Sequence, residues 1–166
     1  MKSWYLIYSK PREEKLAEDH LDRQGYKVYL PLISGRKKQR GRTIKIIQPM
    51  FPRYLFICLS DKTDDWRPIR STIGVSTLVR FGNEPAKVPE KFIRMLKERE
   101  TAEGYHPSVK TVFKEGDIVR IADGPFEGYE AIFSCQDAHD RVTIMLKIAE
   151  KFAKLKIEIT SLEKQD

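Results

Sequence analysis

Cysteine and long apolar runs are scarce in this chain of 166 residues. The two cysteines, Cys58 and Cys135, lie far apart and form no Cys-x-x-Cys pair, so neither a redox motif nor a disulfide framework is expected. The longest apolar run, residues 54–59, has the length of a strand and falls far short of the roughly 20 residues of a spanning helix. The amino terminus has only five apolar residues before polar chain resumes, too few for a signal peptide. We therefore expect a protein of a reducing cytoplasm that does not contact a membrane.

Signatures of catalysis and of cofactor binding are also missing. The three histidines, His20, His106 and His139, are scattered and form no cluster with the spacing of metal ligands. No glycine-rich phosphate loop follows an expected strand, which argues against a nucleotide cofactor. The sequence therefore predicts a protein that is not an enzyme, with no catalytic residue, no metal and no cofactor.

Charge is abundant and unevenly distributed. Hydrophobic residues make up 40% of the chain and aromatic ones 10%, enough to form a core and to exclude a disordered tail. The formal net charge is +7, but residues 1–100 hold 22 basic and 12 acidic side chains, whereas residues 101–166 hold 9 and 12. This asymmetry predicts two functional halves, with a polyanionic partner for the first.

Hydrophobic periodicity predicts an α+β fold for the first half, an antiparallel sheet with helices packed on it. The expected elements are a strand at 4–8, a helix between Pro11 and Gly25 with Leu16, Ala17, His20 and Leu21 on one face, a strand at 26–31, a hairpin at 32–49, a strand at 51–59, a helical turn at 68–72, a strand at 75–81 and a helix opened by Pro89. Strand 51–59 is apolar on both faces, so a helix of the same domain, a second domain or a partner must cover the second face. Residues 100–111 are interpreted as a linker between a domain at 1–99 and another at 112–166.

The second domain carries two conflicting patterns. Apolar runs at 118–121 and 129–133, glycine turns between them and alternation at 156–160 favour the strands of a small β-barrel. Within 142–155, however, apolar residues recur at helical intervals, and the second half of this segment is rich in Ala, Lys and Glu. A β-barrel and a helical hairpin are both compatible with the sequence, as expected for a segment with two uses.

Three groups of polar and basic residues are candidates for contact with nucleic acid. Residues 35–45 hold six Lys and Arg and no acid, which is typical either of a solvated loop or of a phosphate-binding finger. His20, Arg23 and Gln24 share a helical face preceded by Lys10, and such groups can stack on bases or bond their edges, although an ordinary polar helix face has the same pattern. The third group is Arg70, Ser71 and Thr72, on one turn.

Short motifs occur in a fixed order through nearly the whole chain. In the first half they are Ser3-Trp4-Tyr5-Leu6 with Lys10, Pro49 with Phe51-Pro52 and Tyr54-Leu55-Phe56, Gly74-Val75-Ser76, Val79-Arg80-Phe81-Gly82, and Pro89. In the second half, Gly116-Asp117, Gly124-Pro125-Phe126-Glu127-Gly128 and Ala131-Ile132-Phe133 are similar to a KOW signature. Together these motifs resemble the NusG family of transcription elongation factors. Trp4-Tyr5, the Val-Arg-Phe-Gly stretch and the helix-forming residues 142–155 resemble, more narrowly, its specialised RfaH-like branch.

The resemblance implies an operon-specific antitermination and elongation factor; a general NusG-like factor and a basic ribosome- or RNA-binding KOW module are the alternatives. The first domain would bind the clamp helices of the RNA polymerase β′ subunit through the apolar residues Leu6, Tyr8, Tyr54, Phe56 and Phe81. Asp65-Trp66-Arg67 stands where the RfaH-like branch presents His-Thr-Thr to the polymerase β subunit, so the chemistry of that contact would differ. The residues that would bind a non-template single-stranded DNA element are Lys10, His20, Arg23, Gln24, Arg70, Ser71 and Thr72.

The resemblance also implies two folds for the second domain of a monomeric protein. In the closed protein this domain would be an all-α helical hairpin packed on the apolar patch. After release it would be a five-stranded KOW barrel that recruits the ribosome through a small-subunit ribosomal protein. The interdomain residues would be Phe51, Pro52, Ile93 and Leu96 on one side and Phe126, Phe133, Met145, Leu146 and Ile148 on the other. An acid that precedes Pro49 in the RfaH-like branch is here Gln48, so a latch to Arg141 would be a neutral and weaker hydrogen bond.

Overall fold

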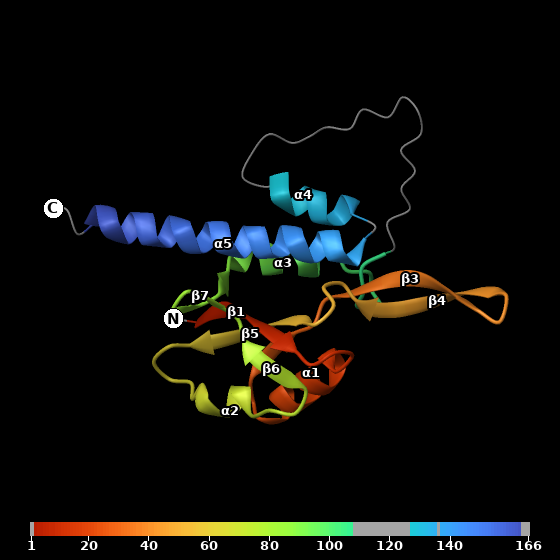
Figure 1. Cartoon of the computed structure of the whole chain (residues 1–166), viewed down its shortest axis with the longest axis horizontal. Coiled ribbons are helices and arrows are strands. Elements are labelled where there is room, and N and C mark those ends of the chain that lie inside the picture. The colour runs from red at the N-terminus through yellow and green to blue at the C-terminus, as the bar shows by residue number, and fades with distance from the viewer. Residues whose placement is uncertain (1, 108–126, 136, 164–166) are drawn as a thin grey trace.

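An antiparallel sheet forms the centre of the computed structural model, which describes residues 2–107, 127–135 and 137–163 (Figure 1). Its strands are β1 (Lys2–Ser9), β2 (Lys27–Tyr29), β5 (Tyr54–Ser60), β6 (Val75–Leu78) and β9 (Lys87–Val88). The strand order is β2-β5-β1-β6, and β9 also pairs with β1. Strands β1 and β5 run side by side without a register shift, from Lys2 opposite Ser60 to Tyr8 opposite Tyr54. The α+β fold expected for the first half is confirmed.

Alternation along β1 and β5 divides the apolar side chains between two cores. Trp4 and Leu6 point to one face of the sheet, whereas Tyr5 and Ile7 point to the other. The same period of two places Phe56 in the first core and its neighbours on β5 in the second. Both faces of the sheet are therefore apolar, and both must be covered.

Helices α1 (Glu14–Arg23) and α2 (Arg67–Arg70) cover one face, and α3 (Glu90–Glu98) packs on the other. Ala17 and Leu21 are the apolar residues that α1 buries, but Leu16 remains 39% exposed, so the face predicted for this helix was wrong at that position. The loop around Gly74 packs directly against Ala17, and residue 16 lies about 100° around the helix from it.

Short strands occur where the sequence predicted one continuous strand at 75–81. The run breaks at Val79, whose N–H donates to the carbonyl of Leu6 (2.9 Å), and it continues as β7 (Arg80–Phe81), paired with β8 (Glu84–Pro85). The predicted hairpin at 32–49 is present as β3 (Leu32–Gln39) and β4 (Arg42–Pro49), a separate two-stranded sheet that projects from the body of the molecule (Figure 1).

The carboxy-terminal residues that the structure describes are helical. They form α4 (Glu127–Ser134) and α5 (Ala138–Glu163), so residues 129–133 and 156–160, which also have a strand pattern, lie in helices here. The expected strand at 118–121, the glycine turns and Phe126 lie outside the described residues. A three-residue connection makes α4 and α5 a helical hairpin, which lies over α3 in Figure 1. No helix in the described ranges combines the length and apolar character that a bilayer span requires.

Candidate functional site

The face of the sheet that carries α3 presents a group of large apolar side chains, which we call the covered face: Leu6, Phe51, Phe56, Phe92, Ile93 and Leu96. All six are buried almost completely. Leu6 and Phe56 lie opposite each other on β1 and β5. The ring of Phe56 lies 6.1 Å from that of Phe51 and 6.0 Å from that of Phe92, both edge to face. These contacts make one continuous aromatic surface from strands and α3.

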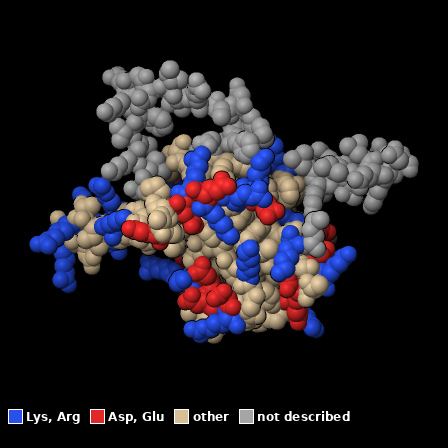
Figure 2. Space-filling model, turned by 180° about the vertical axis from the view of Figure 1, so that it is seen from behind, with Lys and Arg blue, Asp and Glu red and all other residues tan. Residues whose placement is uncertain are grey.

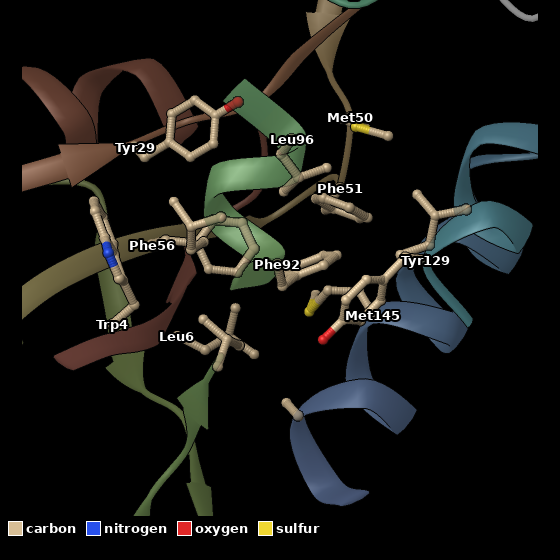
Figure 3. Close-up of a cluster of buried hydrophobic side chains, with 14 of the residues drawn as sticks. Trp4, Leu6, Tyr29, Met50, Phe51, Phe56, Phe92, Leu96, Tyr129 and Met145 are labelled. Atoms are coloured by element: carbon tan, nitrogen blue, oxygen red, sulfur yellow. The ribbon is translucent and has the colours of Figure 1, made fainter. Parts of the chain in front are cut away.

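Helices α4 and α5 complete the burial of the covered face. Figure 3 shows Tyr129 of α4 and Met145 of α5 directed toward Phe92, and the rings of Tyr129 and Phe92 lie 5.4 Å apart. Ile132, Met145 and Ala149 are fully buried in the same core. The chain's own carboxy-terminal helices therefore remove this apolar surface from water.

Three residues of the predicted polymerase-binding patch lie at the edge of the covered face. Tyr8, Tyr54 and Phe81 are half-buried, whereas Leu6 and Phe56 are fully buried. The Tyr8 and Tyr54 rings are 5.0 Å apart, and the Arg53 guanidinium lies 4.0 Å from the centre of the Tyr8 ring. Burial of its hydroxyl raises the pKa of Tyr54 above the ordinary value of a tyrosine.

Arg141 anchors the helical hairpin to the segment between β4 and β5. Its side chain is buried, and its Nε donates to the main-chain carbonyl of Met50 (2.9 Å), while Nη1 donates to the carbonyl of Cys135 (3.2 Å). Gln48, the partner predicted for Arg141, is exposed, and its Nε2 would lie 2.8 Å from a Cβ added at Gly35. The hydrogen bond from Arg141 is made to the main chain of Met50, two residues after Gln48.

The other predicted interdomain residues are distributed around this contact. Phe133, Leu146 and Ile148 are half-buried against the covered face, and Pro52 is exposed. The structure thus brings most of the predicted set together.

His106, in the expected linker, was missed as a contact residue. Its N–H donates to the carbonyl of Leu32 (2.8 Å), and its carbonyl accepts from the N–H of Ser34 (2.8 Å), so it lies against β3. Its ring is buried 5.8 Å from that of Phe133 on α4. Neither ring nitrogen has a hydrogen-bond partner among the described residues. A lone histidine in a polar segment carries no sequence signal of such burial.

The predicted DNA-binding residues lie on the opposite side of the sheet, on what we call the α1–α2 surface: Lys10, His20, Arg23, Gln24, Arg70, Ser71 and Thr72. Lys10, Arg23 and Arg70 are exposed, and His20 is half-buried. The loop 71–74 packs closely on α1, because a Cβ added at Gly74 would lie 2.7 Å from the main-chain nitrogen of Ala17. The structure therefore joins two predicted groups that are about fifty residues apart into one surface.

Gln24 and Thr72 connect the two halves of the α1–α2 surface. Gln24 Nε2 donates to Thr72 Oγ1 (2.8 Å) and to the carbonyl of His20 (3.1 Å). Thr72 Oγ1 in turn donates to the carbonyl of Pro68 (2.8 Å), so it can only accept from Gln24. Gln24 Nε2 therefore donates both of its hydrogen bonds within the protein, and these two bonds fix the orientation of the side-chain amide. Thr72 is itself buried and positions Gln24 rather than facing solvent.

Asp65, Trp66 and Arg67 lie before and within α2 and have different environments. The indole N–H of Trp66 donates to the carbonyl of Ser60 (3.0 Å), and the ring packs edge to face on Tyr5 at 4.6 Å. Asp65 and Arg67 are exposed and pair with each other at 3.1 Å, and this hydrogen bond lowers the pKa of Asp65. Trp66 therefore packs against the core, whereas Asp65 and Arg67 face solvent.

Two exposed apolar residues lie near the α1–α2 surface and were not among the residues predicted for it. Ile73, next to Thr72, is 56% exposed, and Leu16 lies on the outer side of α1. Ile73 directly follows the predicted third group in the sequence, and only the structure shows that its side chain is exposed.

The described part of the chain holds no group of three or more His, Cys, Asp or Glu placed to bind a metal ion. A family model described as "Transcription termination factor nusG" matches residues 2–97, which include both surfaces of the sheet. The chain belongs to the NusG family. Curated NusG relatives named "Transcription termination/antitermination protein NusG" match along almost the whole chain.

Among these relatives, the NusG of Rickettsia prowazekii is 21% identical over 100% of this chain and 92% of its own length. The NusG of Helicobacter pylori is 27% identical over 99% of each chain. A solved structure described as "Domain interaction in Thermotoga maritima NusG" matches 58% of this chain and 55% of that one, at 19% identity and a TM-score of 0.42. The family model and these curated relatives make the chain a NusG-type factor of transcription termination and antitermination.

Proposed function

We propose that this NusG-family chain is an operon-specific antitermination and elongation factor of the RfaH-like kind, whose carboxy-terminal helices mask its polymerase-binding face. The observation that carries the proposal is the packing of α4 and α5 on the covered face, where Tyr129 contacts Phe92 and Ile132 and Met145 are fully buried in the same core as Leu6 and Phe56. Without these helices the covered face would be a contiguous apolar surface of the sort that marks interaction sites. Masking by the chain itself limits binding to occasions on which the helices leave.

The shape of the mask supports a partner made of two helices. Because the covered face accepts a helical hairpin, a pair of partner helices can replace α4 and α5 on the same aromatic residues. The β′ clamp helices of RNA polymerase are such a pair. The exposed Asp65 and Arg67 would contact the β subunit beside them.

The α1–α2 surface supplies the second contact, to the non-template DNA strand. Arg23 and Arg70 are exposed for phosphates or base edges, and Gln24 is held in a fixed orientation by Thr72. Because this surface lies on the opposite side of the sheet from α4 and α5, it is accessible while the covered face is masked. DNA contact would therefore precede release of the helices, and the free helices would refold into a KOW barrel that binds a small-subunit ribosomal protein.

Binding to RNA polymerase tests the masking. Arg141→Ala removes the anchor to Met50 and should release α4 and α5, so it should increase affinity for polymerase that carries no DNA by at least about tenfold. The matched control is Lys151→Ala, on an exposed position of the same helix, which should leave affinity unchanged. Wild-type binding as tight as that of Arg141→Ala would contradict masking and favour a general NusG-like factor.

Sequence-specific recruitment is tested with elongation complexes paused on different non-template sequences. The wild-type chain should bind some of these complexes strongly and most of them weakly, and Arg23→Ala should remove the difference. Equal binding to all sequences would contradict operon specificity while leaving the masking result unaffected.

A further inference from the structure

The β3–β4 hairpin carries a concentration of positive charge that the two surfaces described above do not use. Six of the eleven residues from 35 to 45 are Lys or Arg, and no acid occurs between Asp22 and Asp61. Figure 2 shows these basic side chains gathered on the projecting hairpin. All residues from 36 to 45 are exposed.

Most of this charge has no counter-charge among the residues that the structure describes. Five of the six cations form no ion pair or hydrogen bond with any residue that the structure describes: Arg36, Lys37, Lys38, Arg40 and Arg42. Lys45 donates to the hydroxyl of Tyr105 (2.5 Å) at the base of the hairpin. The hairpin therefore presents unneutralised cations to solvent, and its field attracts anions.

Two features of the hairpin are unfavourable for its own stability. Arg36 lies directly opposite Lys45, and like charges at opposed positions destabilise a strand pair. The turn has positive φ at Arg40 (52°) and at Gly41 (77°), the pattern of a type I′ turn, in which Asn or Gly is preferred at the first position. An arginine in this conformation costs on the order of 1 kcal/mol. Each feature adds positive charge at the expense of folding, as is expected at functional positions.

The cations lie on both faces of the hairpin and at its tip. In the β3–β4 register, Arg36, Lys38 and Lys45 share one face, whereas Lys37 and Arg42 share the other. A ribbon of this kind is suited to phosphates on both of its sides, which the two strands that border a groove of duplex DNA provide. The major groove of B-form DNA is wide enough for a two-stranded ribbon, whereas that of an RNA duplex is too narrow.

We propose that the β3–β4 hairpin is a second nucleic-acid site, which binds the phosphates of duplex DNA without reading base sequence. It is separate from the single-strand contact proposed for the α1–α2 surface. It requires neither polymerase nor release of α4 and α5, so it can be tested apart from the proposed function.

The test measures binding of the full chain to a 20-base-pair DNA duplex of arbitrary sequence over a range of salt concentrations. The variant is Arg36→Gln with Lys37→Gln and Lys38→Gln, and the matched control is Lys147→Gln with Lys151→Gln and Lys154→Gln, three exposed positions on α5. Each phosphate contact contributes about −0.9 to the slope of log affinity against log salt. For the hairpin variant, the slope of log affinity against log salt should therefore be less steep by about 3, and the affinity at low salt should be at least about tenfold lower. The control variant should keep both the slope and the affinity of the wild type.

Three other results would overturn the proposal. These are wild-type affinity in the hairpin variant, an equal loss in the α5 control, or an equal loss on single-stranded DNA or an RNA duplex of the same length. The last result would show that the charge attracts any polyanion and that the ribbon has no preference for duplex DNA.

Arg40→Asn separates binding from stability. Asparagine suits a type I′ turn, so this variant should melt at the same temperature as the wild type or higher, yet it should bind duplex DNA about two- to fivefold more weakly. Unchanged DNA binding in Arg40→Asn would contradict a contact at the hairpin tip.

Discussion

His106 shows how a single residue ties the linker to two elements. It is hydrogen bonded through its main chain to β3, and its ring lies between the first domain and Phe133 of α4. Burial, with a smaller contribution from the charge of Arg99, lowers the pKa of His106 to about 4. The ring is therefore neutral in the folded protein at physiological pH.

This burial predicts a pH dependence of stability. Between pH 6.5 and about 4 the unfolded chain binds a proton at His106 that the folded chain does not, so the free energy of unfolding should decrease as the pH falls through this window. The decrease in the free energy of unfolding that His106 causes is complete near pH 4 and amounts to about 3 kcal/mol. Urea unfolding at a series of pH values measures it. His106→Phe keeps the ring contact and should lack this contribution, and identical pH profiles for the two proteins would contradict the assignment.

Gly74 allows loop 71–74 to pack closely against α1. Its φ is +88°, and an added Cβ would meet the main chain of Ala17 at 2.7 Å. Gly74→Ala should therefore lower the free energy of unfolding by about 3 kcal/mol, from strain and overpacking together. Gly82→Ala is the control, because Gly82 also has positive φ but has no atom within 4 Å of an added Cβ, and it should cost only about 1 kcal/mol. Equal losses in chemical denaturation would show that the contact with Ala17 is unimportant.

At the level of elements, the sequence predicted types better than boundaries. Strands β1 and β5 were predicted because each is a continuous apolar run of strand length, and the helix after Pro89 was predicted because its apolar residues have helical spacing. The two-residue strands β8 and β9 are too short to carry a pattern, and they form only because neighbouring strands supply hydrogen-bond partners. The apolar face of α1 was wrong at Leu16 because the packing of a distant loop selects the buried side.

The α4–α5 hairpin depends on the covered face for its stability. Met145 is fully buried against that face, whereas Lys147, two residues later on α5, is exposed. Met145→Ala should weaken the attachment of the hairpin by about 2–4 kcal/mol, and Lys147→Ala should have little effect. Amide hydrogen exchange in α5 is the measurement, with faster exchange expected only for Met145→Ala. Exchange at the same rate in both variants would contradict stabilisation by the covered face.

For the whole molecule, the proposal that the second domain has two folds predicts a change on separation. Gly104 is exposed and has no atom within 4 Å of an added Cβ, so a protease site can be inserted there in the full chain. After cleavage and dissociation, the carboxy-terminal fragment should lose helical circular dichroism at 222 nm and gain a β-type spectrum. A fragment that remains helical would contradict refolding, while masking of the covered face would still stand.

The candidate sites were predictable in part, and the reason differs between them. The basic residues of α1 and the turn at 70–72 were found from side-chain chemistry, but their union into one surface depends on the Gln24–Thr72 hydrogen bond across 48 residues. The position of His106 against β3 and α4 is likewise a long-range contact without a local pattern. Strand pairing and side-chain packing between distant segments decide such features.

By itself, the sequence determined that both faces of the central sheet are apolar and that its first half is basic. These properties follow from alternation and composition, which are local. Only the tertiary structure decided what covers the second face and which conformation residues 127–135 and 137–163 adopt. The sequence of these segments carries both helical and strand patterns, and the burial of Tyr129, Ile132 and Met145 on the covered face stabilises the helices.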